Sequence, residues 1–326
     1  MSATLRTIVV AGSTTVDLLV GGADHLPTLA DDGFRADNLA WCSEPLRMVV
    51  GGNGANTAFA LGRLGAPVRL FSAIGNDTLG DLMAAWLGRA GVDLSLLRRR
   101  DDAATSTSTV ITDAAWHQIA FHHAGAYATT TFADLPAGWD LALGALLITS
   151  VPLLSGLRGD GYAMLLRAAR AQGAITVMDI GPAIGQVATL AELQPLLPRV
   201  DYLLGNEHEF ATFGAATLDQ AVAASLAGGV GHVIVKRGRI GASIYTPAGM
   251  TDIPALRVAV RQTVGAGDAF DAGLLWALSH GLGVGDAVRW AHATAACVVM
   301  ATEGVLAAPD RAQVEALLAS FSGSLS

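Results

Sequence analysis

The segment RQTVGAGDAFDAGLLWALSH, residues 261–280, places a carboxylate, Asp268, directly after Gly265, Ala266 and Gly267, three residues with almost no side chain. Apolar residues recur after it at helical spacing, so Asp268 is expected in the first turn of a helix. Unpaired N–H groups at a helix N-terminus favour anions, and small side chains let a phosphate approach them closely. The carboxylate could then accept the proton of a hydroxyl that attacks the phosphate. A capped helix start without any ligand would also fit these residues.

Asparagines and glycines form a second candidate group in VVGGNGANTAFALGRLG, residues 49–65. Gly51 and Gly52 follow a strand-like run and let a ligand approach the backbone closely. Asn53 and Asn56 offer paired donors and acceptors that suit hydroxyl groups. A strand-to-helix turn with an asparagine cap is the alternative interpretation.

A third group follows a strand-like run in LLGNEHEF, residues 203–210. Asn206 and Glu209 are three residues apart, so on one helical turn they would face together. Such a pair suits the task of holding a magnesium-bound water near phosphates. Helix capping would explain the same two residues without a ligand.

A fourth group lies in VIVKRGRIGASIY, residues 233–245, which reads as a strand, a glycine-containing turn and another extended run. Gly238 and Gly241 could admit a nucleotide at this turn. Lys236 ends the strand beside them and is the only lysine in the chain.

Alternating strands and helices must position these candidate residues. Short β-branched or apolar runs alternate with helical patterns that end at glycine, as in the strand-like run 68–75 and the helical run 77–91. This alternation predicts an α/β fold with a doubly wound, mostly parallel sheet and helices on both faces. The whole chain, residues 1–326, is expected to form one such domain.

Residues 18–50 and 105–124 interrupt the alternation. The first segment contains no convincing helix, and the second reads as a hairpin with a turn at Asp113 and Ala114. Strands inserted at two points of an α/β frame can pair into a small separate sheet. We expect this small β-sheet to be a lid, close to whatever the main sheet binds.

The composition argues against several classes of protein. Hydrophobic residues make up 52% of the 326 residues and charged residues 15%, so a large core is expected and disorder is not. The formal net charge of −8 argues against nucleic acid or an anionic membrane as a partner. The two cysteines are far apart, and no Cys/His cluster has zinc spacing. Without a signal-like or membrane-spanning run, a cytoplasmic location is expected.

In this order, the four groups resemble the ribokinase-like family, also called the phosphofructokinase-B carbohydrate kinases. The most specific parts of the resemblance are GGNGANTAFALGRLGAPVRLFSAIGND near the N-terminus and TVGAGDAFDAG near the C-terminus. This family transfers the γ-phosphate of ATP to a hydroxyl, usually on a sugar, with Mg²⁺. Its lid is a small β-sheet that is often a dimer contact. The resemblance therefore implies ATP, Mg²⁺, a sugar-like substrate and a homodimer formed through the lid.

The resemblance also implies a role for each matching residue. Asp268 would be the catalytic base, and the N–H groups of Gly265, Ala266 and Gly267 would form an anion hole. The residues that would hold substrate hydroxyls are Asp17, Gly51, Gly52, Asn53 and Asn56. Those that match the nucleotide side are Asn206, Lys236, Gly238, Gly241 and, near adenine, His292, while Glu209 would organise magnesium through water.

The sequence departs from the family pattern at several positions. Gln262 stands where the family usually has an aspartate, which helps to build a monovalent-cation site in potassium-activated members, so potassium dependence is doubtful. Asn53 stands where ribokinases typically have lysine, which weakens the case for ribose. His292 stands where asparagine is common, and a packed helical residue is the alternative to its nucleotide role. Asp271 is expected only to complement the helix dipole.

The expected function is therefore an ATP-dependent phosphotransferase that acts on a hydroxyl of a small sugar or sugar derivative. A nucleoside kinase of the same fold is the alternative, and a catalytically silent sensor is a further one that Gln262 leaves open. A nicotinamide-dependent dehydrogenase is disfavoured, because VVAGSTTVD, residues 9–17, supplies only one glycine of the required G-x-G-x-x-G turn.

Overall fold

A nine-stranded sheet forms the centre of the protein in the computed structural model, which describes residues 6–27, 33–112, 118–182, 184–212, 214 and 217–322. The strands are parallel from β11 to β5, and β12 and β13 add an antiparallel edge. Across the sheet they are β13 (Gly249–Pro254), β12 (Gly241–Thr246), β11 (His232–Lys236), β10 (Tyr202–Asn206), β9 (Ile175–Asp179), β8 (Leu143–Ile148), β1 (Thr7–Ala11), β4 (Val68–Gly75) and β5 (Leu97–Arg100).

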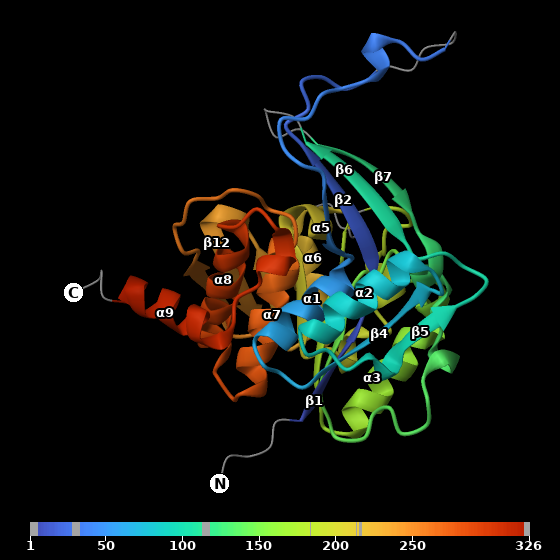
Figure 1. Cartoon of the computed structure of the whole chain (residues 1–326). Coiled ribbons are helices and arrows are strands. Elements are labelled where there is room, and N and C mark those ends of the chain that lie inside the picture. Colours follow the sequence, from blue (N-terminus) through green and yellow to red (C-terminus); the bar gives the residue numbers. More distant parts are fainter. Residues whose placement is uncertain are drawn as a thin grey trace.

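Helices cover both faces of this sheet because its strands are apolar on both sides. Ile8 and Val10 of β1 join the core on one face, whereas Val9 and Ala11 join the core on the other. On the first face lie α1 (Asn53–Arg63), α2 (Thr78–Arg89), α7 (Ala266–Ser279), α8 (Val284–Val299) and α9 (Arg311–Ser322). On the second lie α3 (Asp160–Ala171), α4 (Leu190–Leu193), α5 (Glu207–Ala211) and α6 (Leu218–Ala227) (Figure 1). The predicted fold class is confirmed.

Local sequence signals explain where the helices begin. Asp77 precedes α2, and its side chain accepts a hydrogen bond from the N–H of Gly80. Thr217 caps α6 in the same way through the N–H of Gln220. Short 3-10 turns join the elements: η1 (Ala36–Asn38), η2 (Leu94–Leu96), η3 (Gly125–Thr129), η4 (Phe132–Asp134), η5 (Ser155–Leu157), η6 (Leu197–Arg199), η7 (Gly238–Ile240) and η8 (Gly304–Ala307).

The two irregular segments of the sequence form a separate sheet of four strands. Its order is β3 (Arg47–Gly51), β2 (Thr15–Gly21), β6 (Thr107–Thr112) and β7 (Gln118–His123), with β2 and β6 parallel and the other pairs antiparallel. This small sheet extends away from the helical layers (Figure 1). The hairpin of β6 and β7 is confirmed, while its turn at Asp113 and Ala114 lies outside the described residues.

The carboxyl ends of the central strands gather polar residues along one edge of the main sheet. Ser13 follows β1, Ser150 follows β8, and Asp179, Asn206 and Lys236 end β9, β10 and β11. Open α/β sheets bind their ligands at this edge. In the described part of the chain, no helix has the length and apolar character needed to cross a membrane.

Candidate active site

Asp268 lies in the first turn of α7, as the sequence predicts, and the helix begins with Gly265 as its N-cap. Gly265 has φ of 79°, a left-handed conformation that glycine adopts without strain. The N–H of Ala266 donates to the carbonyl of Thr263 at 3.2 Å, so this amide already has a partner. The N–H groups of Gly267 and Asp268 lie in the first helical turn, where no intrahelical acceptor is available. The helix N-terminus therefore presents amide donors beside the carboxylate.

Two neutral amides hold the carboxylate of Asp268. Asn53 Nδ2 donates to Asp268 Oδ1 at 2.8 Å, and Asn56 Nδ2 donates to Asp268 Oδ2 at 2.7 Å. Burial raises the pKa of Asp268, and the hydrogen bonds from Asn56 and Asn53 reduce this rise without cancelling it. The carboxylate is thus fixed in orientation and is more basic than an exposed aspartate.

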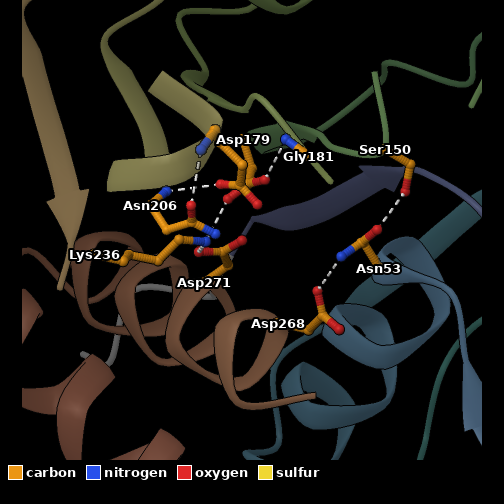
Figure 2. A network of polar contacts seen from close by, with 9 residues as sticks. Asn53, Ser150, Asp179, Gly181, Asn206, Lys236, Asp268 and Asp271 are labelled. Atoms are coloured by element: carbon orange, nitrogen blue, oxygen red, sulfur yellow. Dashed lines mark hydrogen bonds and ion pairs between the residues drawn. The ribbon is translucent and has the colours of Figure 1, made fainter. Parts of the chain in front are cut away.

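A serine that the sequence reasoning missed orients Asn53. The hydroxyl of Ser150 donates to Asn53 Oδ1 at 3.1 Å, which turns Nδ2 of the same amide toward Asp268 (Figure 2). Ser150 Oγ also lies 2.8 Å from Ser13 Oγ. Ser150 has φ of 56°, which is uncommon for a residue other than glycine. A polar pair directly after a buried strand, Thr149 and Ser150 after β8, was the available signal.

Asp17 and Gly51 face each other across two strands of the small sheet. Asp17 is 8% exposed, and its Oδ1 has no hydrogen-bond partner among the described residues. A Cβ on Gly51 would lie 2.1 Å from the carboxyl carbon of Asp17, so a larger residue there would displace this carboxyl. Gly52 is the N-cap of α1, and Asn56 Oδ1 also lacks a described partner. Buried polar atoms without partners are typical of a place where a polar ligand binds.

The environment of Asp17 favours its neutral form. Burial raises the pKa of Asp17 to about 7, a hydrogen bond from Ser108 acts against this rise, and the nearby charge of Asp268 adds to it. The two predicted functional carboxyls are therefore close enough to influence each other.

Lys236 forms the centre of a second polar cluster on the same sheet edge. Its Nζ lies 2.5 Å from Asp179 Oδ2 and 3.3 Å from Asp271 Oδ1 (Figure 2). Burial alone would lower the pKa of Lys236, but the charges of Asp179 and Asp271 outweigh it and raise that pKa. A Cβ on Gly267 would lie 3.6 Å from Lys236 Nζ, so the ammonium group is also next to the start of α7.

Asn206 and Glu209 form a reciprocal cap at the start of α5. The N–H of Asn206 donates to Glu209 Oε2 at 2.7 Å, and the N–H of Glu209 donates to Asn206 Oδ1 at 2.9 Å. Burial and the charge of Asp179 raise the pKa of Glu209 to about 7, although Lys236 acts in the opposite direction. Both sequence interpretations, a cap and a ligand-facing pair, remain compatible with this geometry.

The other residues matched to the nucleotide side lie near β12 and β13. Gly238 begins the turn η7, and a Cβ there would have open space around it. A Cβ on Gly241 would instead meet the carbonyl oxygen of Ile253 at 2.1 Å, so close strand pairing requires that glycine. His292 is 8% exposed and packs edge-on against Phe270, with ring centroids 5.2 Å apart. Burial lowers the pKa of His292 to about 4, so the ring is neutral at physiological pH.

Comparison with known proteins identifies the family. The family model for pfkB family carbohydrate kinases matches residues 20–311. The chain belongs to this family.

Individual pfkB-family relatives differ in the substrate that their names state. The chain is 33% identical over 236 residues to a fructokinase from Rhizobium leguminosarum bv. trifolii, covering 70% of this chain and 71% of that protein. It is 28% identical over 295 residues to a nucleoside kinase from Methanothermobacter thermautotrophicus, covering 90% of this chain and 89% of that one. The structure of Arabidopsis thaliana ribokinase complexed with ribose and ATP is similar with a TM-score of 0.80 and 25% identity, covering 97% and 99% of the two chains.

The expectation for Asp271 in this pfkB-family kinase was wrong. Asp271 lies beyond the first turn of α7, is 1% exposed and contacts Lys236, so it does not merely complement the helix dipole. Burial raises the pKa of Asp271 despite the nearby Lys236. Its role is that of a buried partner of the single lysine.

Proposed function

We propose that this kinase transfers the γ-phosphoryl group of ATP to a hydroxyl of a small sugar or sugar derivative, with Asp268 as the catalytic base. The observation that carries the proposal is the environment of Asp268: a buried carboxylate, oriented by two neutral amides, in the first turn of a helix. Its raised pKa favours proton acceptance from the substrate hydroxyl. Phosphoryl transfer depends mainly on positioning and charge stabilisation, which this arrangement supplies.

The acceptor substrate binds beside Asp17, between the small sheet and the start of α1. Asp17 Oδ1 and Asn56 Oδ1 are buried acceptors without partners in the described structure, so both suit substrate hydroxyls. The backbone of Gly51 and Gly52 permits close contact there, and Asn53 places the acceptor next to Asp268. The small sheet acts as a lid that excludes water from the transferring phosphoryl group.

The phosphates of ATP bind toward the N-terminus of α7 and Lys236. The N–H groups of Gly265 and Gly267, together with the helix dipole, stabilise the negative charge that develops during transfer, whereas the N–H of Ala266 is bonded to Thr263. The ammonium of Lys236 adds a positive charge next to Gly267. Gly238, Gly241, Asn206 and His292 are proposed to contact the nucleotide farther along the sheet edge.

The side chains near Glu209 fit magnesium as well. Two carboxyl groups, Glu209 and Asp179, lie close together here. Lys236 is the positive charge that acts on Glu209 and lowers its pKa. Within the described residues, no group of three or more His, Cys, Asp or Glu side chains is arranged around a metal position. Mg²⁺ usually keeps several waters and binds one or two carboxylates plus substrate phosphates, so Glu209 would hold it through water. Bound magnesium would neutralise phosphate charge during transfer.

The substrate class is tested by a coupled ADP-release assay over sugars, sugar acids, sugar phosphates and nucleosides. A sugar or sugar derivative as the best substrate, judged by kcat/KM, would support the proposal. A nucleoside is the second candidate, because the nucleoside kinase relative covers 90% of the chain. ATP binding without turnover of any compound would instead indicate a non-catalytic sensor.

A homodimer through the outer face of the lid is also proposed. Met48, Leu18, Thr109 and Phe121 lie in one register row across the four strands, on the face opposite Asp17. Met48 is 52% and Phe121 62% exposed, which is unusual for large apolar side chains on one sheet face. Light scattering after gel filtration should give a dimer mass for the parent protein and a monomer mass for Phe121→Lys.

A further inference from the structure

Polar side chains cross the inner face of the lid in a single row. Asp17 of β2 pairs in register with Ser108 of β6, which pairs in register with His122 of β7. Ser108 Oγ lies 2.9 Å from His122 Nδ1, and His122 Nε2 lies 2.7 Å from the hydroxyl oxygen of Tyr127. Ser108 lies next to Asp17 in register, and its hydroxyl acts to lower the pKa of that carboxyl. Two hydrogen bonds therefore connect Tyr127 to Ser108, the neighbour of Asp17.

Tyr127 anchors this row in the body of the protein. Its side chain is 1% exposed and belongs to the core between the main sheet and the helices of the second face. The hydroxyl alone reaches the lid, where it contacts His122 on the edge strand β7. Burial raises the pKa of Tyr127 to about 12, so its hydroxyl keeps its proton under working conditions. A shift of the lid edge relative to the body would break this contact.

The charge of Asp17 determines where each proton of the row lies. An ionised Asp17 can only accept, so Ser108 must donate to it, and Ser108 Oγ then accepts from a proton on His122 Nδ1. His122 Nε2 carries no proton in this state and accepts from Tyr127. A protonated Asp17 that donates to Ser108 reverses every bond, which moves the histidine proton to Nε2. Burial and the neighbouring His123 lower the pKa of His122, which favours the neutral ring.

We propose that Ser108 and His122 are positioning residues, which orient Asp17 for one substrate hydroxyl and favour its ionised form through donors that all point toward it. The proposal deepens the proposed function and rests on it, because Asp17 is taken to bind the phosphoryl acceptor. Asp17 Oδ1 has no partner in the described structure and is thus left for the substrate. Asp268 is a titratable group near the row and raises the pKa of Asp17, while His123, on the opposite face of β7, lowers the pKa of His122 through its charge.

Which nitrogen of His122 carries the proton can be measured without substrate. In the full chain labelled with ¹⁵N-histidine, long-range ¹H–¹⁵N spectra distinguish the two neutral tautomers, and loss of one signal set in His122→Asn assigns His122. We expect the Nδ1–H tautomer at about pH 8.5 and a shift to the Nε2–H tautomer near about pH 6, following the ionisation of Asp17. Asp17→Asn should abolish this change. The Nε2–H tautomer at both pH values would overturn the proposal.

Kinetics of the acceptor substrate give the second test. His122→Ala removes both contacts of the ring and should raise the acceptor KM about tenfold, with kcat and the ATP KM within about twofold of the parent values. His122→Asn keeps a donor toward Ser108, and Tyr127→Phe keeps the ring in the core, so each should raise the acceptor KM only about threefold. His123→Asn, on the opposite face of β7, is the matched control and should change neither constant.

The pH profile separates a positioning role from a merely structural one. Without His122, the pKa of Asp17 should rise, and the acid limb of kcat/KM for the acceptor should move to higher pH. An unchanged acceptor KM and acid limb in His122→Ala would overturn the proposal. If the parent protein phosphorylates no hydroxyl compound, the proposed function fails, while the tautomer measurement still decides the proton order.

Discussion

Asp268 and Asp271 lie about one turn apart on α7 and are both buried, but different groups hold them. Asp268 accepts hydrogen bonds from the neutral amides of Asn53 and Asn56, whereas Asp271 lies against the ammonium of Lys236. An amide orients a carboxylate without cancelling its charge. An ammonium offsets part of the charge, although burial and the neighbouring Asp179 still raise the pKa of Asp271. The same helix therefore presents one carboxylate held by neutral amides and one that lies in a charged cluster with Lys236 and Asp179.

The difference extends to the surroundings of the two carboxylates. The side chains that hold Asp268 through hydrogen bonds are uncharged: Asn53 contacts Ser150, which in turn contacts Ser13. The supports of Asp271 belong to a charged cluster that includes Asp179 and Lys236. Neutral supports suit a group that changes its charge during a reaction, because no neighbouring ion then loses its partner.

The largest effect is expected for Asp268→Asn, which preserves shape and removes the proton acceptor. We expect kcat to fall roughly a thousandfold, within the range attributed to general-base catalysis. Removal of a buried charge should leave the melting temperature within about 3 °C of the parent value. The coupled ADP assay, with ATP affinity from calorimetry, measures these effects. Asp271→Asn is the matched control and should reduce kcat less than about tenfold, and a comparable loss in both variants would remove the distinction between the two carboxylates.

The next effect concerns stability at the charged cluster. Lys236→Met leaves Asp179 and Asp271 without their cation, and breaking a buried pair in this way should lower the free energy of unfolding by about 3 kcal/mol. Adding Asp271→Asn to this variant should recover part of the loss, because one uncompensated charge disappears. Urea denaturation followed by tryptophan fluorescence gives both values. A loss below about 1 kcal/mol would show that the cluster is not held by charge.

The sequence predicted the position of Asp268, the proposed catalytic base, better than the surroundings of Asp271, for a physical reason. Asp268 follows a glycine turn at a helix start, and both features are local. The contacts of Lys236 join β11 to β9, 57 residues away, and to α7, 35 residues away. Helical spacing places Asp271 on a helix but does not say that Lys236 lies opposite it. The unusual position of the only lysine was the available signal.

Strand register limited the prediction of the lid in a similar way. Alternation of strand-like and helical runs predicted the main sheet, and the interrupted segments predicted a separate small sheet. Asp17, Ser108 and His122 meet only because β2, β6 and β7 pair with one particular register. A shift of one residue would turn each side chain to the other face, and nothing in a threonine- and serine-rich strand fixes that register locally.

Asp17 sharpens the comparison because it is another buried carboxyl that, like Asp268 and unlike Asp271, has no described cationic partner. Its pKa in the folded protein is about 7, against 3.8 as the ordinary value. Between these values the folded protein binds a proton that the unfolded chain does not, so this group lowers the free energy of unfolding as pH rises from about 4 to about 7. We expect Asp17→Asn to be more stable than the parent at about pH 8, on the order of 2 kcal/mol, and equal to it near pH 4.

Urea titrations of both proteins at the two pH values measure this difference. Glu209, whose pKa is also raised to about 7, is present in both proteins and does not enter the comparison. The gain at high pH should accompany a higher KM for the acceptor. Asp17→Asn less stable than the parent at both pH values would contradict the assignment of Asp17 as a buried, uncompensated acid.

The smallest effect is expected when sodium is exchanged for potassium. Gln262 again supplies a neutral amide: the N–H of Val264 donates to its Oε1 at 2.6 Å, and its Nε2 donates to the carbonyl of Val298 at 3.3 Å. This neutral side chain connects the segment before α7 to the end of α8. It therefore supplies no negative charge to a monovalent cation. At matched ionic strength, turnover in potassium should therefore differ from turnover in sodium by less than about twofold. Gln262→Asp keeps the acceptor for Val264 and adds a charge, so a larger potassium response should appear in that variant. A strong potassium response of the parent protein would show that carbonyl groups alone build the cation site and that the amide at Gln262 does not replace it.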